Sequence, residues 1–156
     1  MKCNKLVVIT GLSCEGKTTI AVELRDRFGY HIIHTDTMYL PIGRKGLSCQ
    51  VGEEDEEKNG LIREHLHMLT ETTIIEGSHI GNQKELDIFI RELGFEGKVY
   101  IFRISSPHTR ERFNAKYKKE SEDLWVKLND WFIRIYDLKG VHVVENIEEV
   151  INILRD

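Results

Sequence analysis

The chain has 156 residues, of which 31% are charged and 40% hydrophobic, and its formal net charge is −4. This length corresponds to one domain of about 150 residues, large enough to bury a core without disulfides. The short, dense aliphatic runs exclude general disorder. A membrane span needs about 20 consecutive apolar residues, which the sequence lacks, and the acidic balance excludes a chain-wide basic surface for duplex nucleic acid.

The cysteines and histidines form no metal-binding pattern. Cys3, Cys14 and Cys49 have neither the spacing of a CxxC pair nor that of a zinc site. His65 and His67 would point to different faces of a helix, so they do not predict a zinc site. The first residues have no signal-peptide layout. Together these features predict reduced thiols and a cytoplasmic location.

Strand-like and helix-like segments alternate along the whole chain. The expected elements, in chain order, are strand 5–10, helix 18–28, strand 31–34, loop 41–59, helix 57–71, strand 72–75, helix 84–93, strand 98–104, a helix opened by Pro107, helix 121–138, strand 141–144 and a last helix capped by Asn146. The continuous apolar run 5–10 suits a strand that is buried on both faces. The alternation predicts a single α/β domain over 1–156, with a parallel sheet and helices on both faces.

The strongest motif lies between the first strand and the first helix. The pattern G-x-x-x-x-G-K-[ST] is matched in full by Gly11-Leu12-Ser13-Cys14-Glu15-Gly16-Lys17-Thr18. The glycines allow a close approach of the backbone, and the N–H groups from Gly11 to Thr19 can then surround an anion at the helix N-terminus. Lys17 would add a charge at the β and γ phosphates, and the Thr18 hydroxyl would ligate Mg²⁺. The motif therefore predicts binding of ATP with Mg²⁺.

The phosphate loop, the order of the elements and the chain length resemble small P-loop kinases of the nucleoside and nucleotide kinase group. This resemblance implies a three-layer fold with a five-stranded parallel sheet of order 2-3-1-4-5. It also implies phosphates at the carboxyl ends of the strands. A GTPase switch is disfavoured, because the sequence has no Asn-Lys-x-Asp motif.

The residues after the second strand predict the acceptor side. The segment His34-Thr35-Asp36-Thr37-Met38-Tyr39 resembles the Asp-x-x-Tyr element of uridine and nicotinamide riboside kinases, and polynucleotide kinases also place an Asp here. The resemblance implies that Asp36 contacts the acceptor hydroxyl and acts as its base. A helix cap is the alternative role for Asp36. Tyr39 would line the acceptor pocket or pack in the core.

The third strand ends at Glu76-Gly77, which resembles the strand-end Glu-Gly of uridine kinases. Because no Walker B Asp follows an apolar run, Glu76 is the acid placed to hold Mg²⁺ through water. Binding of a sugar hydroxyl and a solvated strand-end position are the alternatives for this residue. His79 could reach the substrate or lie on the surface.

A basic helix is expected in the segment 107–120, where kinases of this group have a lid. Arg112 and Lys116 fall on one helix face and resemble the Arg-x-x-x-Arg of kinase lids, with Lys in the second place. Such cations would neutralise charge on the transferring phosphoryl group. Arg110 could stack on adenine or clamp a phosphate. The alternative is an exposed basic helix paired with neighbouring acidic residues.

These features predict an ATP-dependent phosphotransferase that moves the γ-phosphoryl onto a hydroxyl of a nucleoside-like or other small acceptor. The resemblance also places Val144-Glu145-Asn146 where main-chain groups contact adenine. One alternative is a nucleic-acid 5′-hydroxyl kinase, with Arg44 and Lys45 on the strand. A second is a nucleoside monophosphate kinase, for which Arg44 and Arg63 are the acceptor-side arginines. A third is a nucleotide-binding regulatory module that hydrolyses slowly.

Overall fold

The computed structural model describes residues 3–12, 16–39, 49–105, 109–117 and 121–155. Its strands are β1 (Lys5–Thr10), β2 (His31–His34), β3 (Thr72–Glu76), β4 (Lys98–Ile104) and β5 (Val141–Val144). Its α-helices are α1 (Lys17–Phe28), α2 (Glu56–Arg63), α3 (Gln83–Glu92), α4 (Thr109–Tyr117), α5 (Ser121–Ile135) and α6 (Ile147–Arg155). Two short 3-10 helices, η1 (Thr35–Met38) and η2 (His79–Gly81), follow β2 and β3.

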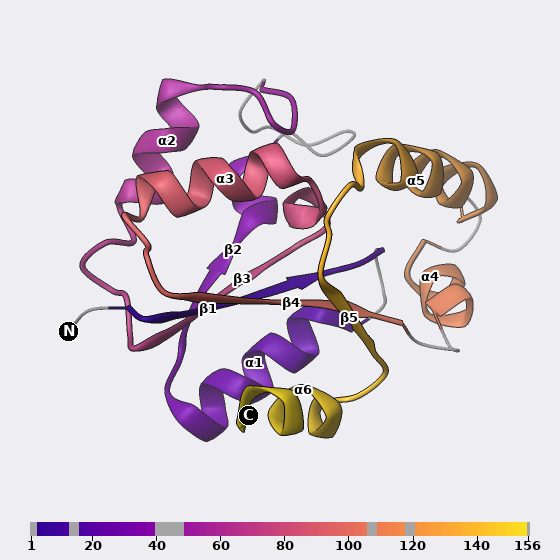
Figure 1. The fold of residues 1–156 in the computed structure, drawn as a ribbon. Helices are drawn as coiled ribbons and strands as arrows, with labels where there is room; N and C mark the ends of the chain where they lie inside the picture. The colour runs from indigo at the N-terminus through magenta and orange to yellow at the C-terminus, as the bar shows by residue number, and fades with distance from the viewer. Residues whose placement is uncertain (1–2, 13–15, 40–48, 106–108, 118–120, 156) are drawn as a thin grey trace.

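The five strands form one parallel sheet in the order β2-β3-β1-β4-β5 (Figure 1). This confirms the expected fold class and strand order. β1 is central because it is the most continuously apolar strand, and β3 beside it is buried along its full length. A parallel sheet covered on both faces needs such strands in its middle.

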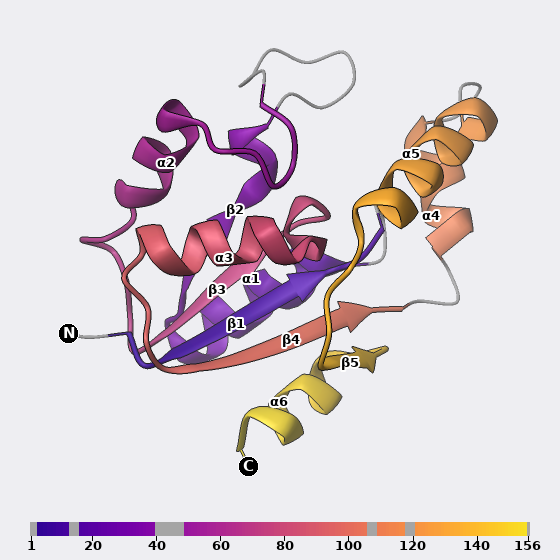
Figure 2. The ribbon, with the colours of Figure 1, turned by 45° about the horizontal axis from the view of Figure 1, so that its top comes forward.

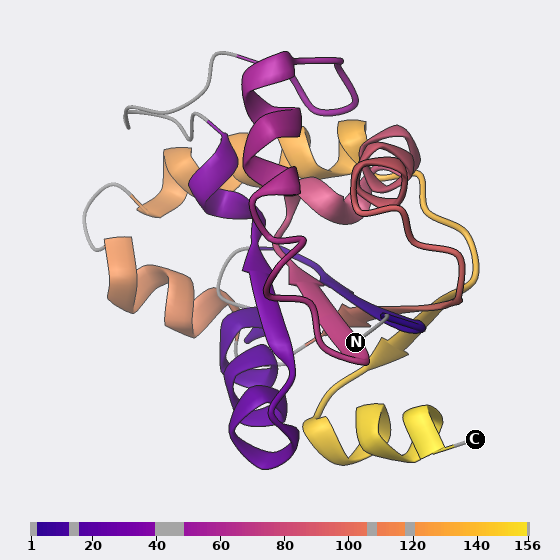
Figure 3. The same ribbon diagram turned by 90° about the vertical axis from the view of Figure 1, so that its left-hand side faces the viewer.

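Helices cover both faces of the sheet, and each face has its own core. α1 and α6 pack on one face, while α2, α3 and the end of α5 lie on the other (Figures 1 and 3). Along β1 the side chains alternate between the two cores, with Val7 and Ile9 facing α1 and with Leu6 and Val8 facing α3. The same alternation decides which face each residue at a strand end occupies.

The helices α4 and α5 lie beyond the carboxyl ends of β1 and β4 (Figure 2). They pack on each other through Phe113 and Trp125, whose ring centroids are 5.0 Å apart. The segment 107–120 therefore has a helix where the sequence predicted a lid, although 106–108 and 118–120 lie outside the described residues. None of the helices in the described ranges combines the length and the apolar character that a membrane span requires.

The segment between β2 and β3 differs from its prediction in two ways. The expected loop 41–59 is wrong at its end, since α2 begins at Glu56, where the Asp55 carboxylate caps the helix by accepting from the Lys58 N–H at 2.9 Å. The expected helix 57–71 is also too long. After α2 the chain forms tight turns, because His65 turns back to β2 and its Nδ1 lies 2.8 Å from the His31 Nε2.

The acidic run 53–57 is mostly exposed, and part of it also takes part in local structure. Glu54 forms a bidentate pair with Arg91 of α3, at 2.5 and 2.9 Å. This guanidinium and the Asn59 amide lower the pKa of Glu54 to about 2. The pair therefore attaches the start of the described segment between β2 and β3 to α3.

A fully buried ion pair joins α2 to α3. The Lys58 Nζ lies 2.9 Å from the Glu85 carboxylate, and neither side chain is exposed to solvent. The same ammonium donates to the Glu53 carbonyl at 2.7 Å, and the carboxylate accepts from the Gly52 N–H at 2.6 Å. The pair therefore also fixes the chain that leads into α2.

We expect Lys58→Met to lower the free energy of unfolding by about 3–5 kcal/mol, because it leaves the buried Glu85 carboxylate without its countercharge. Urea unfolding followed by circular dichroism measures this change. The double variant Lys58→Met/Glu85→Leu is the control, and it should regain part of the loss since no buried charge remains. This account would be contradicted if the double variant lost more free energy of unfolding than the two single variants lose together.

Candidate active site

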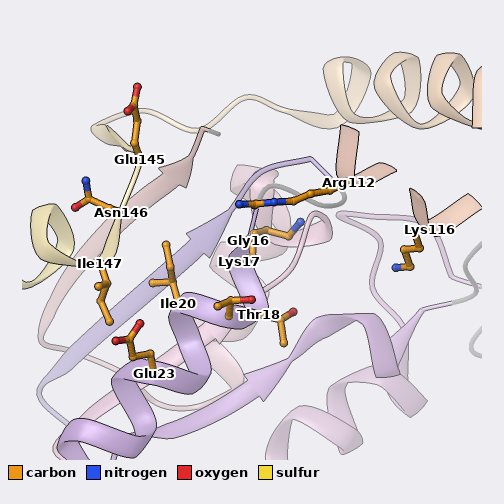
Figure 4. Close-up of a pocket in the computed structure, with 11 residues that line it drawn as sticks. Gly16, Lys17, Thr18, Ile20, Glu23, Arg112, Lys116, Glu145, Asn146 and Ile147 are labelled. Carbon is orange, nitrogen blue, oxygen red and sulfur yellow. The ribbon is translucent and has the colours of Figure 1, made fainter. Parts of the chain in front are cut away.

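A pocket of about 560 Å³ opens at the carboxyl edge of the sheet (Figure 4). Its walls come from the start of α1, from α4 and from the turn between β5 and α6. Its lining residues are Gly16, Lys17, Thr18, Thr19, Ile20, Glu23, Arg112, Lys116, Glu145, Asn146 and Ile147. The pocket thus joins the phosphate loop, the predicted lid and the expected adenine-contacting turn.

The N-terminus of α1 forms the end of the pocket at which the sequence predicts phosphate binding. Gly16 caps this helix in the left-handed region, with a φ of 92°, which a residue with a Cβ rarely adopts. The first turn of the helix itself contains no acidic residue. The buried Lys17 donates from its Nζ to the Leu12 carbonyl at 2.6 Å. Ser13, Cys14 and Glu15, which are expected to supply further N–H groups, lie outside the described residues.

Thr18 and Glu76 meet beside this loop. The Thr18 hydroxyl lies 3.3 and 3.4 Å from the two carboxylate oxygens of Glu76, which is only 2% exposed. Hydroxyl and carboxylate oxygens are donors that suit Mg²⁺, which also keeps several waters. These two residues therefore fit the predicted metal role, and burial excludes the solvated alternative for Glu76. No cluster of three or more His, Cys, Asp and Glu suited to a metal ion occurs within the described residues.

His34 is a site residue that the sequence analysis missed. Its Nδ1 lies 2.6 Å from the Glu76 carboxylate. The contact exists because the ends of β2 and β3 are neighbours, with His34 paired to Glu76 in the sheet register. The sequence signal that could have indicated His34 is its position as the last residue of a strand. Its contact with Glu76, however, follows only from the order in which the strands pair.

Asp36 lies in η1, just beyond the end of β2, with its side chain 63% exposed. It is the second residue of this short helix and not its cap, so the alternative role as a helix cap is not observed. The segments that follow β2 and β3 pack closely against each other, and this packing brings Asp36 to the site. Gly77 has a φ of 141°, and a Cβ there would lie only 1.9 Å from the Thr35 hydroxyl and 3.4 Å from the Asp36 carboxylate. Only glycine permits this packing.

The charges around Asp36 favour its ionised form. Its pKa lies below its ordinary value, chiefly because of its contact with His79, and Lys17 and Lys116 lower it further by their charges. The structure thus brings Asp36 into the electrostatic field of the phosphate loop and of the lid helix. A base must be ionised to accept a proton, so the lowered pKa fits the predicted role of Asp36.

Tyr39 packs in the core, the second of its two predicted positions. It is buried among residues of α3 and β2, and burial together with the Glu85 carboxylate raises the pKa of its hydroxyl. Its ring stacks on that of His79, with centroids 4.2 Å apart and an angle of 7° between the planes. His79 is therefore buried rather than a surface residue.

The lid cations divide into two sets. Arg112 reaches from α4 over the start of α1, and its guanidinium would be 3.4 Å from a Cβ at Gly16; Lys116 lines the same pocket (Figure 4). Arg110 points instead to α5, where it pairs with Glu122 and stacks over the Trp125 ring at 4.7 Å. The structure therefore places Arg112 and Lys116 in the wall of the pocket that contains Lys17, and it places Arg110 in the packing between α4 and α5.

The chain matches known proteins at the level of structure only, since no family model and no curated protein matches it. A gluconokinase from Sinorhizobium meliloti 1021 matches with a TM-score of 0.60 and 14% identity, over 97% of this chain and 90% of its own. An unliganded sugar kinase from Janibacter sp. HTCC2649 matches with a TM-score of 0.56 and 17% identity, over 98% and 92%. The APS kinase of Mycobacterium tuberculosis, in complex with AMPPNP and APS, matches with a TM-score of 0.52 and 14% identity, over 100% of both chains.

The chain has the fold of small P-loop kinases. At these identities the likeness is one of fold. None of the three proteins is a uridine, nicotinamide riboside or polynucleotide kinase, so the finer grouping with those families stays a prediction.

The acceptor-side arginines do not form a phosphate-binding pair within the described residues. Arg63 is held between Glu56 and Glu92, at 2.5 and 2.8 Å. Arg44 and Lys45 lie outside the described residues. The geometry of Arg63 thus gives no support to a nucleoside monophosphate as acceptor.

We expect Arg112→Ala to lower kcat by about 10²-fold, because it removes a cation that faces the phosphates. Arg110→Ala is the matched control on the same helix. It should lower kcat much less and instead lower the thermal unfolding temperature, since it loses the contacts to α5. Steady-state transfer kinetics and thermal unfolding of both variants measure this contrast. Equal losses of kcat would contradict the division of the lid cations.

Proposed function

We propose that the protein is a kinase that moves the γ-phosphoryl of ATP onto a hydroxyl of a small acceptor. The observation that carries this proposal is the arrangement of Asp36, which lies in η1 beyond the end of β2 and within the field of Lys17 and Lys116. A nucleotide-binding module without an acceptor has no use for a carboxylate in this position. The P-loop kinase fold supports the same conclusion.

The nucleotide is proposed to lie along the pocket of Figure 4. Its phosphates would meet the N–H groups at the start of α1, the Lys17 ammonium and the Arg112 guanidinium. Its adenine would lie toward Glu145 and Asn146, between β5 and α6. The pocket of about 560 Å³ extends from the start of α1 to the turn between β5 and α6, so ATP, rather than a lone phosphate, is the fitting occupant.

The residues of the chain then divide the chemistry of transfer. Asp36 accepts the proton of the acceptor hydroxyl as that oxygen forms its bond to the γ-phosphorus. The bond from the γ-phosphorus to the bridging oxygen breaks, and ADP leaves. Lys17, Arg112 and Lys116 stabilise the charge that spreads over the phosphoryl oxygens.

Thr18 and Glu76 are the residues proposed to hold Mg²⁺, with Glu76 acting directly or through water. When bound, the ion supplies charge neutralisation at the phosphate oxygens. His34 orients the Glu76 carboxylate through their 2.6 Å contact. Closure of the lid helix over the pocket would exclude water and so prevent hydrolysis of ATP.

The acceptor is proposed to be a small molecule with a free hydroxyl, such as a nucleoside or a sugar derivative. On the acceptor side of the described chain, Tyr39 after η1, His79 of η2 and Trp131 of α5 pack against one another. A sugar kinase, a gluconokinase and an APS kinase are among the proteins of similar fold. No described residue on this side forms the basic groove that a nucleic-acid acceptor would need.

A transfer screen tests the proposal. Purified protein with Mg²⁺ and γ-labelled ATP is offered nucleosides, aldonic acids, sugars, nucleotides and 5′-hydroxyl oligonucleotides, and labelled products are separated. We expect label on one class of small acceptor, and none with Asp36→Asn. Label released only as inorganic phosphate under all conditions, together with nucleotide-dependent association with another protein, would overturn it in favour of the regulatory module.

A further inference from the structure

His79 is buried between two aromatic rings at the acceptor side. Its ring stacks flat on Tyr39, with centroids 4.2 Å apart, and meets the edge of Trp131 at 5.0 Å with an angle of 67°. Its side chain is only 11% exposed. A histidine ring held by two rings in this way has a fixed orientation, since rotation would lose both contacts.

The orientation of this ring aims one nitrogen at Asp36. The His79 Nδ1 lies 3.4 Å from the Asp36 Oδ1. This nitrogen is buried and has no hydrogen-bond partner among the described residues. The separation is longer than an ordinary N–H···O bond, but contacts between catalytic groups are often long without substrate and shorten when it binds. A buried imidazole nitrogen of this kind calls for a partner, and the carboxylate is the group in front of it.

We propose that His79 is a positioning residue for Asp36, holding one carboxylate oxygen so that the other faces the acceptor hydroxyl. The proposal rests on the kinase function proposed above and adds a residue to its mechanism. With its hydrogen on Nδ1, His79 donates to Oδ1, and Oδ2 remains to accept the proton of the acceptor. After that proton transfer the contact persists, because Oδ1 is then the carbonyl oxygen of the carboxylic acid.

The Asp36 carboxylate depends on His79 for its orientation, because rigid elements hold His79 in place whereas Asp36 itself is loosely held. Asp36 is exposed and sits in a four-residue 3-10 helix, so its own backbone restricts its side chain little. Tyr39, by contrast, is anchored in the core, with the buried Lys58 ammonium 5.7 Å from its ring centre. Trp131 belongs to α5, whose last turn is tied to the start of α3 by a 2.7 Å bond from the Asn82 amide to the Ile135 carbonyl. Rigid elements thus orient an otherwise mobile base.

Among the described residues, the titratable groups that act on Asp36 are His79 from η2, Lys17 from α1 and Lys116 from α4. All three lower the pKa of Asp36, and the contact with His79 is the largest cause. Removal of the His79 nitrogen should therefore raise this pKa. Because Asp36 must be ionised to accept a proton, the acidic limb of the pH profile of kcat/KM should move to higher pH.

Two substitutions distinguish the contribution of the His79 Nδ1 nitrogen from that of its aromatic ring. His79→Phe keeps an aromatic ring on Tyr39 and removes the donor, while His79→Asn keeps an N–H group near the Nδ1 position and removes the ring. His67→Phe is the matched control, because His67 is an exposed histidine away from the site. We expect His79→Phe to lower kcat about 10- to 100-fold with little change in KM for ATP, His79→Asn to retain more activity, and His67→Phe to match the wild type.

A carbon-detected NMR titration of the Asp36 carboxyl group, assigned with Asp36→Asn, tests the contact without any acceptor. We expect a higher Asp36 pKa in His79→Phe than in the wild type and in His67→Phe. An unchanged pKa would overturn the positioning role, as would full kcat in a folded His79→Phe. Failure of the wild type to phosphorylate any acceptor would instead count against the kinase function, since the titration does not depend on transfer.

Discussion

Lys17→Met is expected to lower kcat for phosphoryl transfer by about 10²- to 10³-fold, the cost of removing one preorganised charge from a transition state. The ammonium of Lys17 is buried at the start of α1 and already points into the loop, where it bonds to the Leu12 carbonyl. It is therefore oriented before the nucleotide arrives. Methionine preserves the length of the side chain, so the loss reports the charge. Steady-state kinetics with the acceptor found in the screen measure it.

The matched control for this variant is Lys139→Met, which removes an exposed lysine in the turn before β5. It should leave kcat unchanged, and both variants should unfold at temperatures close to that of the wild type. Binding of a fluorescent ATP analogue should weaken in Lys17→Met alone. Retention of full transfer activity by Lys17→Met would contradict the assignment of the pocket as the nucleotide site.

Asp36→Asn is expected to lower kcat by about 10²- to 10⁴-fold, the usual contribution of a general base. Asparagine keeps the size and polarity of the side chain, but its amide cannot accept the proton that the acceptor hydroxyl must lose. Because Asp36 does not line the pocket proposed for the nucleotide, affinity for ATP should stay within a few-fold of the wild type. Transfer kinetics and nucleotide binding, measured on the same preparation, test both parts.

Asp130→Asn, at an exposed position on α5, is the control and should behave as the wild type. The pH dependence gives a second check. Since the pKa of Asp36 is lowered in the folded protein, transfer by the wild type should persist at pH values below the ordinary range of an aspartate before it falls. An Asp36→Asn protein with normal kcat would assign the base to another group.

The elements of the fold were predictable because their signals are local. The apolar run of β1, the glycine-rich turn and the helical spacing of α1 are contiguous in sequence, and the structure confirms the strand and the helix. The end of α2 was not predictable in the same way. Its apolar spacing continues past Arg63, but the contact of His65 with His31 on β2 turns the chain back. Such a contact joins residues that are distant in sequence, and periodicity carries no information about it.

The candidate site was likewise predictable where its residues belong to local motifs, and not where they depend on contacts between distant segments. Lys17, Thr18 and Asp36 follow from motifs, and the structure brings them together at the carboxyl edge of the sheet. The different orientations of Arg110 and Arg112 could not be read from a basic helix, because they depend on where Glu122 and Gly16 lie in space. His34 likewise became visible only when the strand order placed it beside Glu76.

The sequence by itself determined the phosphate loop, the alternation of strands and helices, and the presence of an acid after the second strand. Each of these depends on residues that are neighbours in the chain, where backbone geometry and periodicity act directly. The tertiary structure alone decided which side chains share a surface: the Glu76 carboxylate with His34 and Thr18, and the Asp36 carboxylate with His79. Those pairings arise because strand order and side-chain alternation bring distant segments to one edge of the sheet. Neither property can be predicted from a single segment of the sequence.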